Sequence, residues 1–443
     1  MRLKLGAIPT IVISSPETAR DILKVHDLQC CNRPSLNGPR RLSYNSLDIG
    51  FCPYGDYWRE MRKFCVLELL SKKRLQSFQS IREQEVMSVI DFISQASLNK
   101  TPIDVSDMIF SLTAFTTCKI AFGRGFRGTK IDVGRFQDIM HEATSLLAGF
   151  SASDFFPYTG WLVDLLTGFH GRLEKIFHKF DEFYQQIIDQ HVDTKRGTDE
   201  VEDVIDILLK LAEDDQADFG TLQITPNHIK AILMNLFLGG VDTTAITMTW
   251  AMAELVRNPD ILKKVQHEVR ACVGNRGRVT ENDVEDLHYL KLIVKETLRL
   301  HPPAPLLGPR ETMSAVKLNG FDIPNKTRIL INAWGIGRDP SSWKSADEFI
   351  PERFQDSPID YKGQYFQFLP FGSGRRGCAG MYMGVTMVEL GLANLLYSFD
   401  WTVPNGMEDI DMEEGFGLTA HKKKPLILLP LLHHKEETDM VSN

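Results

Sequence analysis

A single cysteine stands in a segment whose composition suits chemistry better than packing. The segment Phe371–Gly380 reads FGSGRRGCAG, and the pattern predicts that Cys378 opens a helix running to about Phe399. A thiolate at a helix N-terminus is stabilised by the helix dipole and by free backbone N–H groups. The glycines leave the backbone bare, so a flat group can approach the sulfur, and Arg376 can pair with a carboxylate of that group. A planar, anionic cofactor with a soft metal meets these demands, and we expect haem.

A second unusual group lies in the middle of a long apolar helix predicted over about 226–257. The segment Gly239–Thr244 reads GGVDTT. Each glycine costs about 1 kcal/mol relative to alanine inside a helix, the threonines can bend the helix, and a buried Asp242 needs a partner. Broken local rules of this kind are typical of a functional site. The pattern predicts either a bulge that holds a small ligand, with Asp242 and Thr243 as an acid–alcohol pair that passes protons, or a packing kink against a neighbouring helix.

An acidic and a basic side chain, Glu296 and Arg299, stand three residues apart on a helix predicted over about 289–300. That spacing places both on one face of the helix. A solvent-exposed pair would contribute less than about 1 kcal/mol to stability, whereas a buried pair needs further partners. Arg353 is a candidate third member. The sequence leaves the exposed and the buried alternatives open.

The composition excludes several classes of protein. A net charge of -8 excludes a general nucleic-acid-binding protein. The seven cysteines contain no C-x-x-C pair, which argues against a disulfide framework and a zinc site. No run of 18 apolar residues predicts a membrane span. Residues 1–75 carry a charge of +6 and the remainder -14, so a basic patch lies near the start of the chain.

The elements that must position these residues are mostly helices. Strand-like patterns occur at about 1–14, at 321–332 and in pieces after the last helix, such as the one that begins at Leu426. No repeat or low-complexity linker divides the chain. We therefore predict a mainly α fold with small β-sheets, and one catalytic domain over residues 1–443.

Five motifs of this sequence resemble those of the cytochromes P450, the haem-thiolate monooxygenases. They follow one another along the chain in the order found in that family. The phrases LHPPAP and PFGSGRR resemble the plant A-type microsomal enzymes in particular. The resemblance implies the cytochrome P450 fold, with haem b between the long central helix and the cysteine-bearing segment, and O2 as co-substrate. The matching positions are Trp58 and Arg62; Gly239–Thr244; Glu296 and Arg299; residues 351–354; and Phe371, Gly374, Arg376, Cys378 and Gly380.

The resemblance also implies a role for each of these residues. Cys378 is expected to be the axial thiolate ligand of the metal, with Phe371 and Gly380 close to the sulfur. The haem propionates would be bound by Trp58, Arg62, Arg310 and Arg376. A buried triad would be formed by Glu296, Arg299 and Arg353. Asp242 and Thr243 would relay protons. The substrate would contact Leu236, Gly239, Ala304, Leu307 and Leu418.

These roles imply a monooxygenase that inserts one oxygen atom of O2 into a small lipophilic substrate of plant secondary metabolism, such as a terpenoid, phenylpropanoid, indole or oxime derivative. Electrons from NADPH would arrive through NADPH–cytochrome P450 reductase, with cytochrome b5 as a second donor. One alternative is a haem isomerase or dehydratase of the same fold, against which the Asp242–Thr243 pair argues. The other is a non-catalytic, truncated haem protein.

Members of this type begin with a membrane anchor, a hinge and a first helix, whereas this sequence opens at the expected first strand. We therefore expect those segments to be missing and membrane association to be weakened, while the expected location stays the cytosolic face of the endoplasmic reticulum membrane. A basic cluster is either solvated surface charge or a docking face for the reductase. Its members are Arg59, Lys63, Lys72, Lys73, Arg74 and Arg375.

Overall fold

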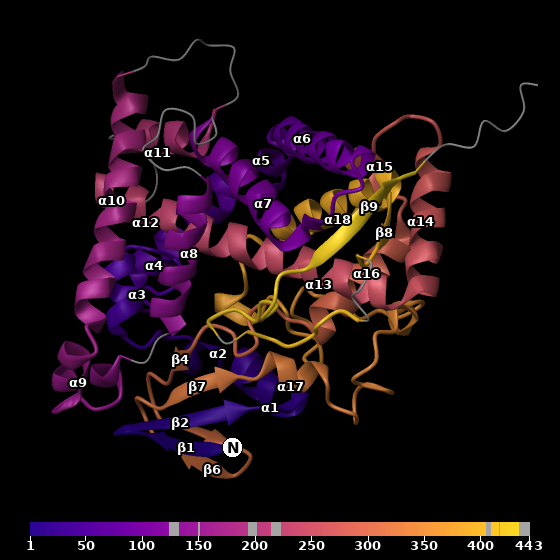
Figure 1. Ribbon diagram of the computed structural model, residues 1–443. Coiled ribbons are helices and arrows are strands. Elements are labelled where there is room, and N and C mark those ends of the chain that lie inside the picture. The colour runs from indigo at the N-terminus through magenta and orange to yellow at the C-terminus, as the bar shows by residue number, and fades with distance from the viewer. Residues whose placement is uncertain are drawn as a thin grey trace, which may run out of the picture.

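Helices form most of the molecule; the sheet that contains the first two strands of the chain lies below the helical body, and the last two strands lie against the helices (Figure 1). The structure is a computed structural model and describes residues 1–123, 133–148, 151–193, 202–213, 223–404, 409–415 and 417–433. The predicted fold class, mainly α with small β-sheets, is confirmed.

The largest sheet joins the start of the chain to residues far along it. Strands β1 (Arg2–Leu5) and β2 (Ile8–Ile13) form an antiparallel pair, and β2 runs parallel to β7 (Arg328–Ile331). Strand β4 (Arg310–Glu311) pairs with the other edge of β7. Within this sheet β7 therefore lies between Arg310 and the N-terminal strands. The remaining strands form two smaller sheets: β3 (Ile103–Asp104), β9 (Ile427–Leu432) and β8 (Phe399–Thr402) in one, and β5 (Val316–Leu318) and β6 (Phe321–Ile323) in the other.

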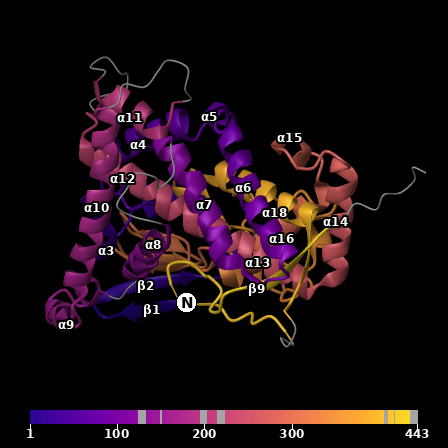
Figure 2. The same ribbon diagram turned by 45° about the horizontal axis from the view of Figure 1, so that its top comes forward.

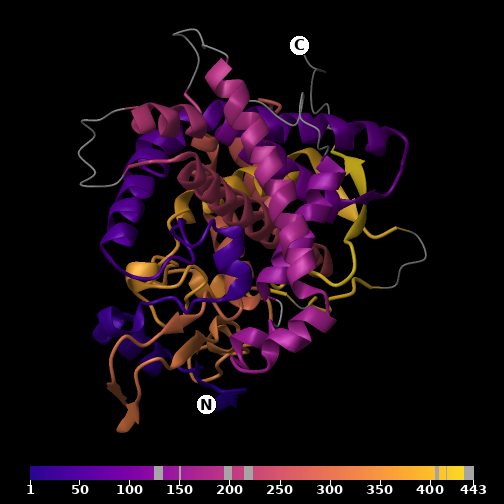
Figure 3. The same cartoon turned by 90° about the vertical axis from the view of Figure 1, so that its left-hand side faces the viewer.

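The first half of the chain supplies the helices from α1 to α11, of which α7 is mostly buried. The long helix α10 stands along one side of the molecule, as the side view shows (Figure 3). The helices and helical turns are α1 (Pro16–Arg20), η1 (Asp21–Val25), α2 (Asp27–Cys30), α3 (Asn37–Leu42), α4 (Asp56–Phe64), η2 (Cys65–Leu69), α5 (Lys72–Ser77), α6 (Gln79–Leu98), α7 (Val105–Phe122), α8 (Val133–Ala148), η3 (Ala152–Asp154), α9 (Gly160–Leu166), α10 (Phe169–Asp193) and α11 (Val204–Glu213).

The second half supplies the central helices. The helices and helical turns are α12 (Pro226–Phe237), η4 (Leu238–Asp242), α13 (Thr243–Arg257), α14 (Pro259–Val273), α15 (Glu281–Val284), α16 (His288–Leu300), α17 (Ala333–Gly337), η5 (Pro351–Phe354), η6 (Gly374–Arg376) and α18 (Met381–Ser398).

The long predicted helix over 226–257 is present as α12, η4 and α13 in continuous succession. Thr225 and His228 form a capping box at its start, and Pro226 occupies the first helical turn. Its second part, α13, contacts α7, α16 and α18 (Figure 2). Trp250 is fully buried in this contact region. The core therefore sits around α13, beside the site.

Two helices, Val105–Phe122 and Pro226–Arg257, are long and apolar enough to cross a membrane by length and composition. In both, 67% of the apolar window is buried inside the protein. Burial of this extent is typical of core helices in a globular domain.

Candidate active site

The central helix changes its winding at the predicted motif. Residues Leu238–Asp242 form a π-helical turn, a form that is frequent at functional sites. The Thr243 hydroxyl donates to the carbonyl of Gly239 at 2.5 Å, which supports the turn. A Cβ atom at Gly239 would have no neighbour within 4 Å, and one at Gly240 would lie 3.7 Å from Thr117 Oγ1. Gly240 thus approaches α7, whereas Gly239 borders open space, and the π-helical turn is itself a local bulge, so the bulge is favoured over the packing kink.

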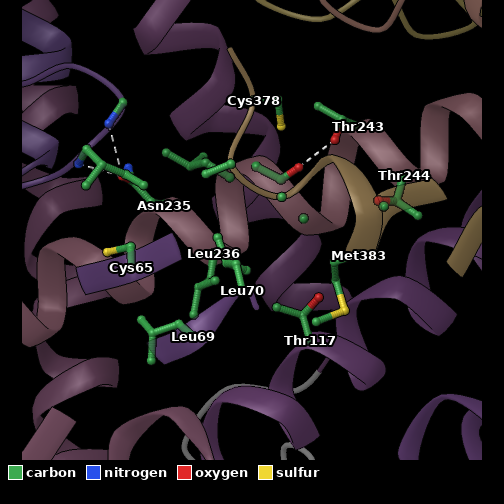
Figure 4. A pocket seen from close by; sticks show the side chains of 18 of the residues that line it. Cys65, Leu69, Leu70, Thr117, Asn235, Leu236, Thr243, Thr244, Cys378 and Met383 are labelled. Carbon is green, nitrogen blue, oxygen red and sulfur yellow. Dashed lines mark hydrogen bonds between the residues drawn. The ribbon is translucent and has the colours of Figure 1, made fainter. Parts of the chain in front are cut away.

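This turn borders a cavity of about 390 Å³. Its wall is mostly apolar and is drawn from segments far apart in the sequence. Figure 4 shows Cys378 and Thr243 at the cavity together with Leu69, Leu70 and Leu236. Of the predicted site residues, those that line it are Arg62, Leu236, Gly239, Thr243, Phe371, Arg376, Cys378, Gly380 and Leu418.

A second cavity of about 230 Å³ adjoins the first and shares Cys378 and Thr243 with it. Ala304 and Leu307 line this second space, and Arg310 borders it as well. All five residues predicted to contact substrate therefore lie on one cavity or the other.

Cys378 lies in a turn held by its own backbone, and its N–H donates to the carbonyl of Phe371 at 2.9 Å. Helix α18 begins only at Met381, so the expectation that Cys378 opens the helix is wrong. The glycines before the cysteine favour a turn, which ends only where the helical pattern resumes. Cys378 is exposed to the cavity but lies deep in the protein. Burial raises its pKa, while the Gly380 N–H and the Arg62 charge lower it in part.

Three guanidinium groups, those of Arg33, Arg62 and Arg376, converge on the cavity. None pairs with a carboxylate in the part of the chain that the structure describes. They donate to backbone carbonyls instead: Arg62 to Gly377 at 2.5 Å and Arg376 to Cys52 at 2.7 Å. Burial lowers the pKa of Arg376 to about 10. Burial also lowers the pKa of Arg33, with a further contribution from the charge of Arg376. The cavity wall is therefore strongly positive.

Two predicted propionate donors are placed differently from these three. The guanidinium of Arg310 pairs with Asp27 at 3.0 Å and donates to the Ser373 carbonyl at 2.8 Å, so its charge is balanced inside the protein. Trp58 lies behind the cavity wall, where its Nε1–H donates to the carbonyl of Ile49 at 2.9 Å. The guanidinium of Arg376 stacks over its ring at 4.1 Å.

Asp242 and Thr243 do not bond to each other through their side chains in the structure. The buried Asp242 carboxylate accepts a hydrogen bond from Thr419 Oγ1 at 2.7 Å. Burial raises the pKa of Asp242, and the Thr419 bond lowers it in part. Thr419 follows Leu418 in the C-terminal segment, so one short stretch contacts both the cavity and the acid.

The structure brings Glu296, Arg299 and Arg353 together and buries the first two completely. Arg299 forms a two-pronged bond to Glu296, at 2.7 and 2.8 Å. Arg353 Nε also donates to Glu296 at 2.8 Å. The exposed alternative for the Glu296–Arg299 pair is thus excluded.

A family model identifies the chain. The model described as Cytochrome P450 matches residues 1–429, which include every motif discussed above. The chain belongs to the cytochrome P450 family. It is therefore a haem-dependent monooxygenase that uses O2, an oxidoreductase of a family whose members bind small substrates and take electrons from redox partners.

The chain is similar to cytochromes P450 of a plant. Cytochrome P450 71B36 and cytochrome P450 71B37 of Arabidopsis thaliana are each 55% identical to it, over 434 and 433 residues. Each match covers 97% of this chain and 86% of the relative. These matches place it among the plant cytochromes P450 of that group.

Solved structures confirm the cytochrome P450 fold. Two structures of a zebrafish cytochrome P450, titled with progesterone and with abiraterone, superpose with TM-scores of 0.83 and 0.82. They are 23% identical in sequence, and the matches cover 97% and 98% of this chain and 96% of theirs.

The residues present in this cytochrome P450 fit a haem group. The buried guanidinium groups of Arg33, Arg62 and Arg376 lack carboxylate partners among the described residues, and an anionic ligand would balance them. A Cβ atom at Gly239 or Gly380 would meet nothing within 4 Å, so bare backbone borders the space on two sides. The Cys378 sulfur lies on the same cavity and supplies a soft ligand.

Sequence reasoning missed several residues of this site. Arg33 lines both cavities, and Asn235 and Thr419 bind backbone or acid groups next to them. Arg33 sits in a loop without periodicity, and its partners Gly308 and Pro309 lie far along the chain. No local pattern could have marked it.

Proposed function

We propose that this cytochrome P450 inserts an oxygen atom into a small lipophilic substrate of plant secondary metabolism. The observation that carries the proposal is the mostly apolar cavity shared by the Cys378 sulfur and the Thr243 hydroxyl. An apolar wall with few polar groups is typical of pockets for lipophilic ligands. Residues 1–443 are proposed to act as one catalytic domain, because one sheet pairs the first strands with residues 310–331.

Cys378 is proposed to hold the metal of haem b, with Arg33, Arg62 and Arg376 facing the propionates. Haem with a thiolate ligand, when bound, supplies the activation of O2 for insertion into a C–H bond. Arg310 is assigned a weaker part, because Asp27 already balances its charge. Trp58 is assigned an indirect part, because it stacks on Arg376 and binds the Ile49 carbonyl. Phe371 and Gly380 are proposed to shape the surroundings of the sulfur. The triad of Glu296, Arg299 and Arg353 is proposed to anchor the fold.

Asp242 and Thr243 are proposed to move protons towards the cavity. Burial raises the pKa of Asp242, which favours a proton on its carboxyl group at higher pH than for an exposed aspartate. The Thr243 hydroxyl donates its hydrogen to the Gly239 carbonyl, so its oxygen can still accept a hydrogen bond from a donor in the cavity. A water molecule or a side-chain rotation must link the two, since they share no side-chain bond.

Electrons are proposed to come from NADPH–cytochrome P450 reductase, with cytochrome b5 as a second donor. Of the predicted basic cluster, Arg59, Arg74 and Arg375 pair with carboxylates of this chain. Lys63, Lys72 and Lys73 are exposed and have no carboxylate partner among the described residues. These three lysines are the members best suited to attract an acidic flavoprotein.

The proposed location is the cytosolic face of the endoplasmic reticulum membrane. Helix α9 exposes Trp161, Leu162, Leu165 and Leu166, and Leu166 is 85% exposed. Ala7 in the β1–β2 turn donates to the carbonyl of Phe155 at 2.7 Å, so this apolar face lies beside the N-terminal sheet. Exposed patches of this kind mark sites of protein or membrane contact.

The absorption spectrum of the dithionite-reduced, CO-bound protein tests the proposal. We expect a Soret band at the long wavelength typical of thiolate ligation, and its loss in Cys378→Ser with haem still bound. A short-wavelength band in the parent protein would show that Cys378 does not ligate the iron.

Substrate-dependent NADPH consumption with the reductase separates the monooxygenase from the alternatives. A haem isomerase or dehydratase would turn over without O2 and NADPH, and a non-catalytic haem protein would not turn over at all. Oxygen-independent product formation would overturn the proposal.

A further inference from the structure

Part of the cavity wall lacks the support of any helix or strand. Ile49, Gly50 and Phe51 lie in the loop between α3 and α4, yet all three line the main cavity. Such a segment must satisfy its backbone N–H and C=O groups through other partners. The identity of those partners shows what holds the wall in place.

Two side chains accept all three amide hydrogens of this wall. Asn235 Oδ1 accepts from the N–H of Ile49 at 3.0 Å and from that of Gly50 at 3.2 Å. Asp48 Oδ2 accepts from the N–H of Gly50 at 3.0 Å and from that of Phe51 at 2.9 Å. Asn235 Nδ2 donates to the same Asp48 oxygen at 2.9 Å. Figure 4 shows Asn235 and its hydrogen bonds beside the cavity.

Two other side chains hold carbonyl groups of the same segment. Trp58 Nε1 donates to the Ile49 carbonyl at 2.9 Å, and Arg33 Nε donates to the Gly50 carbonyl at 2.8 Å. A Cβ atom at Gly50 would lie only 3.2 Å from Asp48 Oδ2, so the bonded groups leave little room there. The wall is thus fixed between the central helix and the proposed propionate side.

The burial of the Asp48 carboxyl group reduces the stability of the folded protein, which is unexpected for a residue with a structural role alone. Its side chain is completely buried, and its Oδ1 atom has no hydrogen-bond partner in the described structure. Burial raises the pKa of this carboxyl, and the bond from Asn235 lowers it in part. Unsatisfied buried polar atoms are rare in folded proteins and are concentrated where function retains them.

We propose that Asp48 and Asn235 form a positioning pair that sets how a lipophilic substrate is oriented in the cavity. The pair ties the Ile49–Phe51 wall to α12, directly before the π-helical turn at Leu238–Asp242. The Ile49 and Phe51 side chains are thereby held at a fixed place relative to the central helix. This inference rests on the proposed function of the cavity.

The same bonds define the chemistry that the substrate meets at this wall. Asn235 Oδ1 already accepts two hydrogen bonds from the wall, and its Nδ2 donates one to Asp48. The substrate therefore meets the apolar side chains of Ile49 and Phe51 there. We assign an apolar part of the substrate to this side of the cavity.

Hydrogen–deuterium exchange of the holoenzyme tests the pair directly. In Asn235→Leu we expect the peptide covering residues 48–52 to exchange about tenfold faster, because the Ile49 amide loses its acceptor and the Gly50 amide loses one of its two acceptors. Asn227→Leu is the matched control, since Asn227 is an exposed residue on the same helix. Unchanged exchange in Asn235→Leu would overturn the proposal.

Two related variants keep the test decisive. If Asn235→Leu does not fold, Asn235→Asp keeps the acceptor oxygen but places a second carboxyl group against Asp48 in place of the donor. Exchange should then rise at Gly50 and Phe51, whose amides bond to Asp48. Asp48→Asn keeps an acceptor oxygen and should retain most of the protection. Equal exchange in Asn235→Asp and the parent protein would contradict the pairing.

Ligand titration then separates positioning from folding. Imidazole and 4-phenylimidazole both bind haem iron through a ring nitrogen. The phenyl ring of 4-phenylimidazole extends further into the apolar cavity than imidazole alone. In Asn235→Leu we expect the Kd of 4-phenylimidazole to rise about fivefold and that of imidazole to change less than about twofold. Equal changes for both ligands would contradict a positioning role. Absence of the thiolate band in the parent protein would instead refute the proposed function, while the exchange result stands independently.

Discussion

At the scale of single residues, the site is marked by charges that burial does not favour. Asp242 is held by one hydroxyl, and three arginines face the cavity without carboxylate partners in the described chain. Groups of this kind reduce stability and are retained where chemistry needs them. The loss of folding stability that each of these groups causes can be measured. Such a measurement tests the role of a residue without knowledge of the substrate.

Asp242→Asn is expected to stabilise the protein at neutral pH while it impairs turnover. The raised pKa of Asp242 means that the folded state holds its proton more tightly than the unfolded state. That contribution to stability is present at low pH and is lost as the pH rises through the folded-state pKa. The amide imitates the protonated acid, so it should gain about 1.4 kcal/mol for each unit by which the pKa is raised.

Urea unfolding of the holoenzyme at pH 7 and pH 5 measures this difference. The stability gap between variant and parent protein should shrink as the pH falls towards the ordinary carboxyl pKa. A variant that is less stable at pH 7 would contradict the sign of the argument.

At the scale of elements, the π-helical turn and the triad do opposite things. The turn of Leu238–Asp242 opens the central helix to the cavity, whereas the triad joins α16 to the segment around Arg353. The π-helical turn departs from regular α-helical winding at the cavity. The triad adds buried ion pairs that hold α16 against the segment around Arg353.

Gly239→Ala should separate helix stability from cavity size. Alanine is favoured over glycine by about 1 kcal/mol inside a helix, and a Cβ atom at this position meets no atom within 4 Å beyond its own stretch of helix. We expect unchanged or increased stability in urea unfolding, together with weaker binding of 4-phenylimidazole. Gly240→Ala is the comparison, because its Cβ atom would point towards Thr117 at an ordinary contact distance of 3.7 Å. Weaker binding in Gly240→Ala alone would contradict the placement.

Glu296→Ala should be strongly destabilising. Its removal leaves Arg299 and Arg353 without the carboxylate that both contact, and Arg299 is completely buried. Loss of one member of a buried ion pair costs about 3–5 kcal/mol. The surface pair of Glu413 and Lys423 is the control, because both side chains are largely exposed. Glu413→Ala should cost less than about 1 kcal/mol in the same unfolding measurement.

Several of these elements were predictable from the sequence, because each is marked by residues that lie close together along the chain. The glycines around Cys378, the GGVDTT segment and the Glu296–Arg299 spacing are patterns within a few residues. The start of α18 was misplaced because a glycine-rich turn precedes it. Arg33, Asp48, Asn235 and Thr419 were missed because their partners come from distant segments, as in the bond from the Ile49 N–H to Asn235, 186 residues away. Only the folded chain brings such groups together.

At the scale of the whole molecule, exposed apolar side chains gather at one end. Helix α9 lies beside the N-terminal sheet, and α6 lies at the far end of the helical body (Figure 1). This polarity orients the molecule against a lipid surface if the α9 face is the contact.

Removing the apolar face of α9 should weaken membrane binding. Trp161 and Leu166 are 54% and 85% exposed, and burying such a side chain contributes about 1.5–3 kcal/mol. We expect Trp161→Ala combined with Leu166→Ala to lower partitioning into phosphatidylcholine–phosphatidylserine vesicles about tenfold or more. Phe92→Ala is the control, because Phe92 is 60% exposed on α6 at the other end. Equal loss in both variants would argue against a specific lipid-facing side.

The unbalanced arginines have a consequence for how this protein is made. A newly synthesised chain must bring Arg33, Arg62 and Arg376 into its interior, where they repel one another until an anion neutralises them. We expect the last stage of maturation to wait for haem, and chains that miss it to be cleared by the cell's proteases. The amount of enzyme in a tissue would then follow the supply of haem as closely as the supply of messenger RNA.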